Sequence, residues 1–163
     1  MSNPSKAKGT AAETAAVRYL NNNGWPGAER AALHGNHDHG DITGTPGLCF
    51  EVKAGKQAEQ AADYLISTWL DQTEKERLNS HANIGILVTK RAGHGTTRVG
   101  DWWAWVTVDT LIYIVTNDHY SMDHDCYHEI GTVESAPIRM KLDDLVAILQ
   151  TNGYGTPQER NRC

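Results

Sequence analysis

Gly40-Asp41-Ile42, followed after a short turn by Leu48-Cys49-Phe50-Glu51-Val52-Lys53, is the stretch of this sequence that decides the fold. The second segment is an apolar run that predicts a β-strand. Because successive strand side chains point to opposite faces, Glu51 and Lys53 share one face while their apolar neighbours lie on the other. A hairpin through the intervening turn would bring Asp41 beside them. Two carboxylates and a lysine held on adjacent strands are suited to bind a divalent cation and a phosphate.

The alternative interpretation is a half-exposed hairpin in which Glu51 and Lys53 are ordinary surface charges. A Glu-x-Lys triplet alone is a weak signal. The context favours a functional site, because the triplet ends an apolar strand, an acid precedes it in a turn-strand setting, and an amphipathic helix with a further acid comes first.

Composition limits the class of protein. A chain of 163 residues predicts a single domain spanning 1–163, with mobile tails at 1–5 and 156–163. It contains no apolar stretch of bilayer-spanning length and no signal-peptide pattern at its polar start, so a cytoplasmic location is expected. Three cysteines without paired spacing are expected to be reduced thiols: Cys49, Cys126 and Cys163.

The formal net charge of −5 argues against a nucleic-acid binder, because affinity for phosphates comes mainly from Lys and Arg. The objection is partly local. Residues 90–98 contain three basic side chains and no acid, and their glycines would let the backbone approach a phosphate chain. A second basic group lies near the N-terminus. The DNA contacts expected from the two groups are Lys6, Lys8, Arg30, Lys90, Arg91 and Arg98. Arg18 adds positive charge to the N-terminal group but is not one of these expected contacts.

Hydrophobic periodicity and turn residues predict an α/β fold, with a mixed central β-sheet flanked by α-helices. The expected helices are residues 6–22, 57–79 (one long helix, bent near Asp71), 109–115 and 142–150. The expected strands are residues 28–33, 41–43, 48–53, 84–89, 102–108 and 137–141.

The N-terminal third resembles the PD-(D/E)XK nuclease superfamily. Its opening Lys8-Gly9-Thr10-Ala11-Ala12-Glu13, with Leu20 and Gly24-Trp25, is similar to the archaeal-type Holliday-junction resolvases. The resemblance implies a restriction-endonuclease-like core and becomes vague after Lys53. Gly40 stands where the family name has proline, which is the least chemical member of the motif.

By this resemblance Glu13 is the helix acid, Asp41 and Glu51 are metal carboxylates, and Lys53 orients the attacking water. The Val52 carbonyl would join Asp41 and Glu51 in holding Mg²⁺, with Glu13 as a further candidate ligand and Mn²⁺ as a substitute ion. The implied activity is Mg²⁺-dependent cleavage of branched DNA by a homodimer, since resolving a four-way junction requires two symmetric cuts.

Glu13 also has a structural interpretation. Thr10 and Glu13 fit a capping box, in which Glu13 would bond back to the backbone at the helix start. If the helix instead begins near Pro4, then Glu13 lies in its interior on a stripe with Val17 and Leu20. We favour the second arrangement, in which an acid faces the sheet.

Two histidine-rich segments could supply zinc ligands, although their spacings match no zinc module. The first, beside the expected site, includes Asp38, which could replace Asp41, and could contact phosphate or be a plain loop. The second is more simply a solvated loop. The segments contain His34, His37 and His39, and then His119, His124, Cys126 and His128.

Trp102, Trp103 and Trp105 could stack on unpaired bases, but tryptophans in a strand more often belong to a core or a dimer interface. Two alternatives to a resolvase therefore stay open. One is another PD-(D/E)XK endonuclease, of restriction or repair type, acting on duplex or flapped DNA. The other is a non-catalytic, zinc-stabilised DNA-binding protein.

Overall fold

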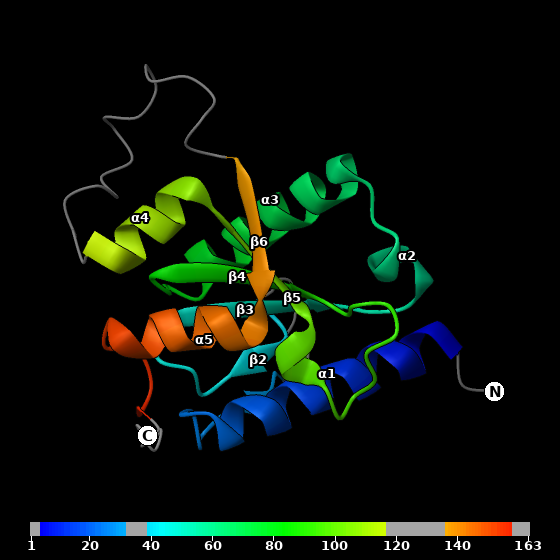
Figure 1. Cartoon of the computed structure of the whole chain (residues 1–163), viewed down its shortest axis with the longest axis horizontal. Helices are drawn as coiled ribbons and strands as arrows, with labels where there is room; N and C mark the ends of the chain where they lie inside the picture. The colour runs from blue at the N-terminus through cyan, green and yellow to red at the C-terminus, as the bar shows by residue number, and fades with distance from the viewer. Residues whose placement is uncertain (1–3, 32–38, 117–135, 158–163) are drawn as a thin grey trace.

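A computed structural model describes residues 4–31, 39–116 and 136–157, with the side chains from residue 7 onward. Within these residues the chain is an α/β structure with a mixed six-stranded sheet flanked by helices (Figure 1). The helices are α1 (Pro4–Asn22), α2 (Lys56–Glu59), α3 (Asp63–Asn79), the 3-10 turn η1 (Val99–Asp101), α4 (Val108–Thr116) and α5 (Leu142–Thr151). The strands are β1 (Glu29–Arg30), β2 (Ile42–Thr43), β3 (Leu48–Lys53), β4 (Ile84–Thr89), β5 (Trp103–Thr107) and β6 (Pro137–Lys141).

The strands lie in the sheet in their chain order, β1 to β6. Only the β3–β4 pair is parallel among them, and α2 and α3 form its crossover connection. The predicted hairpin is confirmed, since Ile42 of β2 pairs with Phe50 of β3. Buried on both faces, β3 and β4 form the centre of the molecule.

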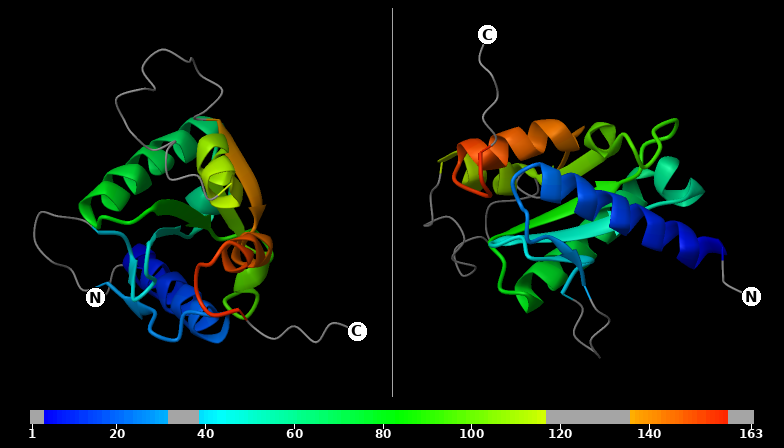
Figure 2. Two further views of the ribbon diagram at one scale, coloured as in Figure 1. Left: turned by 90° about the vertical axis from the view of Figure 1, so that its left-hand side faces the viewer. Right: turned by 90° about the horizontal axis from the view of Figure 1, so that it is seen from below.

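The two faces of the sheet have different character. One face packs against α1, α4 and α5, and its core includes Phe50, Ile86 and Trp102, each no more than 1% exposed. Helix α3 covers β3 and β4 on the other face, as the two turned views show (Figure 2). Alternation along β3 puts Glu51 and Lys53 on this α3 face. The main apolar core thus lies on one face of the sheet and the candidate site on the other.

Strand β1 is Glu29–Arg30 where 28–33 was predicted, with 32–33 outside the described residues, and β2, β5, α4 and α5 differ from the predictions by one residue at one or both ends. Two further differences concern helices. Helix α1 begins at Pro4, two residues early, and the predicted long helix at 57–79 is two helices instead of one bent at Asp71. The break follows from the backbone, because Gln60 leaves helical geometry at the end of α2 and Ala62 is extended before α3. Thr156, expected in a mobile tail, donates its backbone N–H to the carbonyl of Gly24 at 2.8 Å.

Within the described ranges, no helix combines the length and the apolar character that crossing a membrane requires. Cys49, on β3, is buried, and its thiol donates to the His39 carbonyl at 3.6 Å. The other two cysteines, Cys126 and Cys163, lie outside the described residues.

Candidate active site

The β2–β3 hairpin fixes Asp41 against the backbone of β3. The Asp41 N–H donates to the Phe50 carbonyl at 2.8 Å, and its carboxylate Oδ2 accepts the Val52 N–H at 2.8 Å. The Asp41 carboxylate therefore lies at the backbone of Val52, the residue that follows Glu51. The sequence prediction that the hairpin would bring these two acids together is confirmed.

Gly40 stands where the resemblance to the nuclease motif would place a proline. Its φ of +85° lies in the left-handed region, which proline cannot adopt. A Cβ at this position would also lie 2.8 Å from Cys49 Sγ and 2.9 Å from the Phe50 carbonyl oxygen. Glycine therefore lets the chain turn closely over β3 so that Asp41 can reach the Val52 N–H.

Glu51 and Lys53 lie side by side on the α3 face of β3. The Lys53 ammonium donates to Glu51 Oε1. Glu51 is 4% exposed, whereas the Lys53 side chain is partly open to solvent. Burial raises the pKa of Glu51 to about 7, with Lys53 opposing the shift and the neighbouring Glu76 adding to it. Glu51 thus loses much of its hydration and is only partly compensated by one cation.

Helix α3 adds two polar residues that the sequence analysis did not identify. Gln72 Oε1 accepts from Lys53 Nζ at 3.2 Å, and Gln72 Nε2 donates to Glu51 Oε1 at 3.4 Å and to Glu76 Oε1 at 2.7 Å. Glu76, one turn further along, is 1% exposed. Gln72 therefore links the acid and the amine of the Glu-x-Lys triplet to the covering helix. The i, i+4 spacing of Gln72 and Glu76 was the one sequence feature that could have identified them. It does not stand out, because α3 is rich in polar residues on every side.

Glu13 is the tenth residue of α1 and lies in the interior of the helix, so the capping-box interpretation is wrong. Its carboxylate accepts two hydrogen bonds from the Arg30 guanidinium, at 2.9 Å and 2.6 Å. The side chain is 19% exposed. Glu13 is also near enough to Asp41 for its negative charge to raise the pKa of that carboxyl. The predicted helix acid and Asp41 thus belong to one electrostatic neighbourhood, with Arg30 at its edge.

Asp41 has the same unusual electrostatics as Glu51. Burial, and then the negative charge of Glu51, raises the pKa of Asp41 to about 7, while the hydrogen bond from Val52 opposes this. Asp41 and Glu51 lie beside each other, and the raised pKa values show that ionising both is unfavourable. Binding of a cation between them would therefore be strongly favoured. The donor set of carboxylate oxygens suits Mg²⁺, which binds through one or two carboxylates and keeps its remaining ligands as water.

No group of three or more His, Cys, Asp or Glu side chains suited to a metal occurs in the described part of the chain. The zinc hypothesis falls on other residues. Of the candidate zinc ligands, the structure describes only His39. The others lie outside the described ranges: His34, His37 and Asp38 in the first segment, and the four candidates from His119 to His128 in the second.

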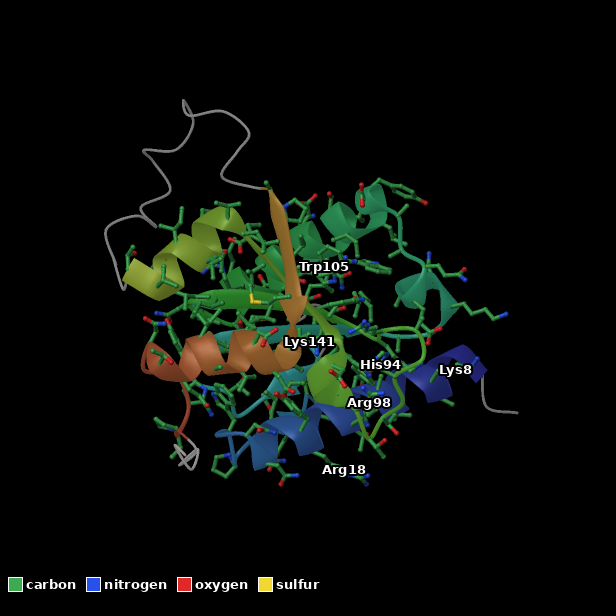
Figure 3. All side chains as sticks on the ribbon, in the orientation of Figure 1. Lys8, Arg18, His94, Arg98, Trp105 and Lys141 are labelled. Carbon is green, nitrogen blue, oxygen red and sulfur yellow. The ribbon has the colours of Figure 1, made fainter. Side chains whose placement is uncertain are left out.

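The residues expected to contact DNA divide into two groups. Arg30, Lys90 and Arg98 are paired with Glu13, Glu59 and Asp101, respectively. Lys8 is exposed on the first turns of α1 (Figure 3). The guanidinium of Arg91 stacks on the Trp103 ring. The Lys6 side chain lies outside the described set. Several of the predicted cations are thus neutralised within the protein.

The three tryptophans also divide. Trp102 is fully buried, which confirms the core interpretation for that residue. Trp103 and Trp105 are partly exposed, and they lie on the α3 face because they alternate with the buried Ala104 and Val106.

Comparison of the chain with protein-family models, curated proteins and solved structures gives no match. The functional interpretation therefore rests on the geometry of Asp41, Glu51, Lys53 and the residues that surround them.

Proposed function

We propose that this protein is a metal-dependent endonuclease of the PD-(D/E)XK type, with a restriction-endonuclease-like core, that hydrolyses phosphodiester bonds in branched DNA in the manner of a Holliday-junction resolvase. One observation carries the proposal. Asp41, directly before β2, and Glu51, on the paired strand β3, lie next to each other, both have pKa values raised to about 7, and Lys53 hydrogen-bonds to Glu51. Buried acids arranged with a single amine are costly to fold and are retained where chemistry needs them.

The carboxylates of Asp41 and Glu51 and the carbonyl of Val52 would hold Mg²⁺, or Mn²⁺ in its place. Glu13 is close enough to Asp41 to influence the same ion. When bound, the ion supplies positive charge that stabilises the negative charge developing on a phosphodiester during hydrolysis. Every ligand in this set is oxygen, which favours these ions over zinc.

We assign to Lys53 the role of orienting the attacking water, which is the nucleophile. Its ammonium is fixed by Glu51 and Gln72, so it is presented at a defined position beside the acids. A compact positive charge there can hydrogen-bond the attacking water and orient it toward phosphorus. Gln72 acts as a positioning residue, because it accepts from Lys53 and donates to both Glu51 and Glu76.

A four-way junction requires two cuts, and the described part of the chain contains one set of these residues. The proposal therefore includes a homodimer that presents two sites to one DNA molecule. A cytoplasmic enzyme of DNA recombination or repair is the biological role that such an activity would serve.

The test is cleavage of end-labelled four-way junction, flap, duplex and single-stranded DNA in Mg²⁺, Mn²⁺ or EDTA. We expect metal-dependent cleavage with the four-way junction preferred, and paired cuts if a dimer acts. Preference for duplex or flap would favour a restriction-type or repair-type enzyme. Lack of cleavage of all four in either metal, together with tight stoichiometric zinc in the purified protein, would replace the enzyme by a zinc-stabilised DNA-binding protein.

A further inference from the structure

The α3 face of the sheet continues past the candidate site onto β5 and β6. In the strand registers Lys53 is level with Thr89 and then with Trp103, and Glu51 is level with Leu87 and then with Trp105. Residues level with each other on paired strands point to the same face. Trp105 Nε1 donates to Thr89 Oγ1 at 2.9 Å, which fixes the indole ring on this face. The site and the two indole rings thus lie on the same face of the sheet, with β4 between them.

Two arginines stack on these rings. The Arg91 guanidinium lies 4.2 Å from the centroid of the Trp103 ring, and the Arg139 guanidinium lies 4.5 Å from Trp103 and 5.5 Å from Trp105. We call these four residues the Arg–Trp platform. A guanidinium that stacks through its flat face keeps its N–H donors in its own plane, where they can bind phosphate oxygens. The tryptophans therefore hold two cations in fixed positions.

Within the described residues, no carboxylate forms an ion pair with the arginines of the Arg–Trp platform. The ion pairs of the described residues leave out both Arg91 and Arg139, whereas Lys90, Arg98 and Lys141 nearby each pair with a carboxylate. Arg139 is exposed on β6, at the edge of the six-stranded sheet. In a chain of net charge −5, two uncompensated guanidinium groups on the face of the candidate site attract an anion to that place.

We propose that the Arg–Trp platform binds the phosphodiester backbone of the nucleic-acid strand whose cleaved phosphate lies at Glu51 and Lys53. The inference rests on the proposed function and adds the path of the substrate. Trp103 is two strands from Lys53, or roughly 10 Å, which is the rise of about three nucleotides in a stacked strand. Arg91 and Arg139 then contact phosphates a few nucleotides from the cut, with Trp103 and Trp105 keeping their guanidinium groups in place.

The experiment measures the salt dependence of binding to a labelled four-way junction, with Ca²⁺ in place of Mg²⁺ to limit cleavage. Arg139→Gln removes one charge from the platform. Arg18→Gln is the matched control, because Arg18 is an exposed cation on α1, which covers the opposite face of the sheet (Figure 3). Arg91→Gln combined with Arg139→Gln removes both platform charges. Thermal melts of each variant establish that it is folded.

We expect the slope of log K against log salt to become shallower by about 0.9 for Arg139→Gln and by roughly twice that for the double variant. The control slope should stay at the wild-type value. Wild-type slopes in the folded platform variants, or an equal change in Arg18→Gln, would overturn the platform while leaving the nuclease proposal intact. If the wild-type protein binds and cleaves none of the DNA substrates, the proposed function itself fails.

Discussion

Asp41 and Asp101 are two aspartates in opposite electrostatic situations. Burial and Glu51 raise the pKa of Asp41 to about 7, and the nearest hydrogen bond to its carboxylate comes from a backbone N–H. Asp101, on the surface turn η1, accepts from both Lys141 and Arg98, and these bonds lower the pKa of its carboxyl. The fold thus gives two cations to the Asp101 carboxylate, whose pKa burial hardly affects, and no directly bonded cation to the Asp41 carboxylate, whose pKa burial raises.

The difference separates a structural ion cluster from a site that requires an external partner. Exposed ion pairs contribute little to stability, since their attraction is screened and two long side chains must be ordered. A buried, uncompensated carboxyl costs stability whenever it is ionised. Ionising Asp41 and Glu51 therefore lowers the free energy of unfolding, whereas ionising Asp101 does not. A bound cation is the simplest physical way to remove that loss of stability.

The largest expected effect is on cleavage. Asp41→Asn and Glu51→Gln each remove a charge that would hold the metal, and Lys53→Ala removes the ammonium beside it. We expect each to lower the rate of cleavage by roughly a thousandfold or more, with DNA affinity nearly unchanged. Single-turnover assays and binding titrations on the same junction measure both quantities. Full activity in any one variant would remove that residue from the site.

The second largest expected effect is on how the free energy of unfolding depends on pH when EDTA removes metal ions. The folded pKa values of Asp41 and Glu51, about 7, exceed their ordinary values of 3.8 and 4.5, so the folded protein binds more protons than the unfolded chain between these limits. The free energy of unfolding should then fall as the pH rises from about 4 to about 7, by a few kcal/mol in total. Chemical denaturation at a series of pH values measures the slope.

Two controls sharpen this prediction. The double variant Asp41→Asn with Glu51→Gln should lose most of the slope and should be more stable than wild type at pH 8. Mg²⁺ should stabilise the wild-type protein at pH 8 but hardly at pH 5, where both carboxyls are protonated. Equal stabilisation of the double variant by Mg²⁺ would place the ion elsewhere.

The parts of the site that the sequence could predict are those set by local geometry. Alternation along β3 places Glu51 and Lys53 together whatever surrounds them, and the short turn fixes the partner strand. Gln72 enters the site only because α3 crosses β3 at one particular angle, which no local pattern encodes. The Arg–Trp platform depends on the registers of three strands, one of which follows a long connection.

The fold shows the same division. Strands β3 and β4 have the predicted bounds because their apolar runs are continuous and end at turn residues. The sequence did not predict the break between α2 and α3, because the segment 60–62 has no glycine or proline and its residues are compatible with a helix. Packing of α3 across the sheet overrides that local preference.

Glu13 tests how far the Asp41 neighbourhood extends. If Glu13 contributes charge to the metal site, Glu13→Gln should lower cleavage by about tenfold or more while the Arg30 contact survives, because an amide oxygen can still accept from the guanidinium. A Mg²⁺ titration of the cleavage rate should show weaker dependence on the ion at low concentration. Normal cleavage at every Mg²⁺ concentration would restrict Glu13 to its pairing with Arg30.

Gln72 should have a smaller effect, through Lys53. Gln72→Leu keeps the size of the side chain but removes its three hydrogen bonds, so the ammonium is held by Glu51 alone. We expect kcat to fall by roughly tenfold with KM unchanged, and the pH profile of kcat to shift. Gln72→Glu, which can still accept from Lys53, should recover part of the rate. A change in melting temperature alone, with normal kcat, would make Gln72 a packing residue.

Asp101→Asn should have the smallest effect, and one of opposite sign to that at Asp41. The pKa of Asp101 is lowered in the folded protein, so its ion pairs contribute stability above the ordinary aspartate pKa of 3.8 and lose it as the pH falls through the lowered value. The variant should melt slightly below wild type at neutral pH, and the difference should shrink in high salt. Cleavage should be unaffected, because the paired charges lie on a surface turn. Asp41→Asn in EDTA at pH 8 should instead melt above wild type. If the two variants shift the melting temperature in the same direction, then the contrast between a compensated and an uncompensated aspartate is wrong, and the cost assigned to the buried pair does not exist.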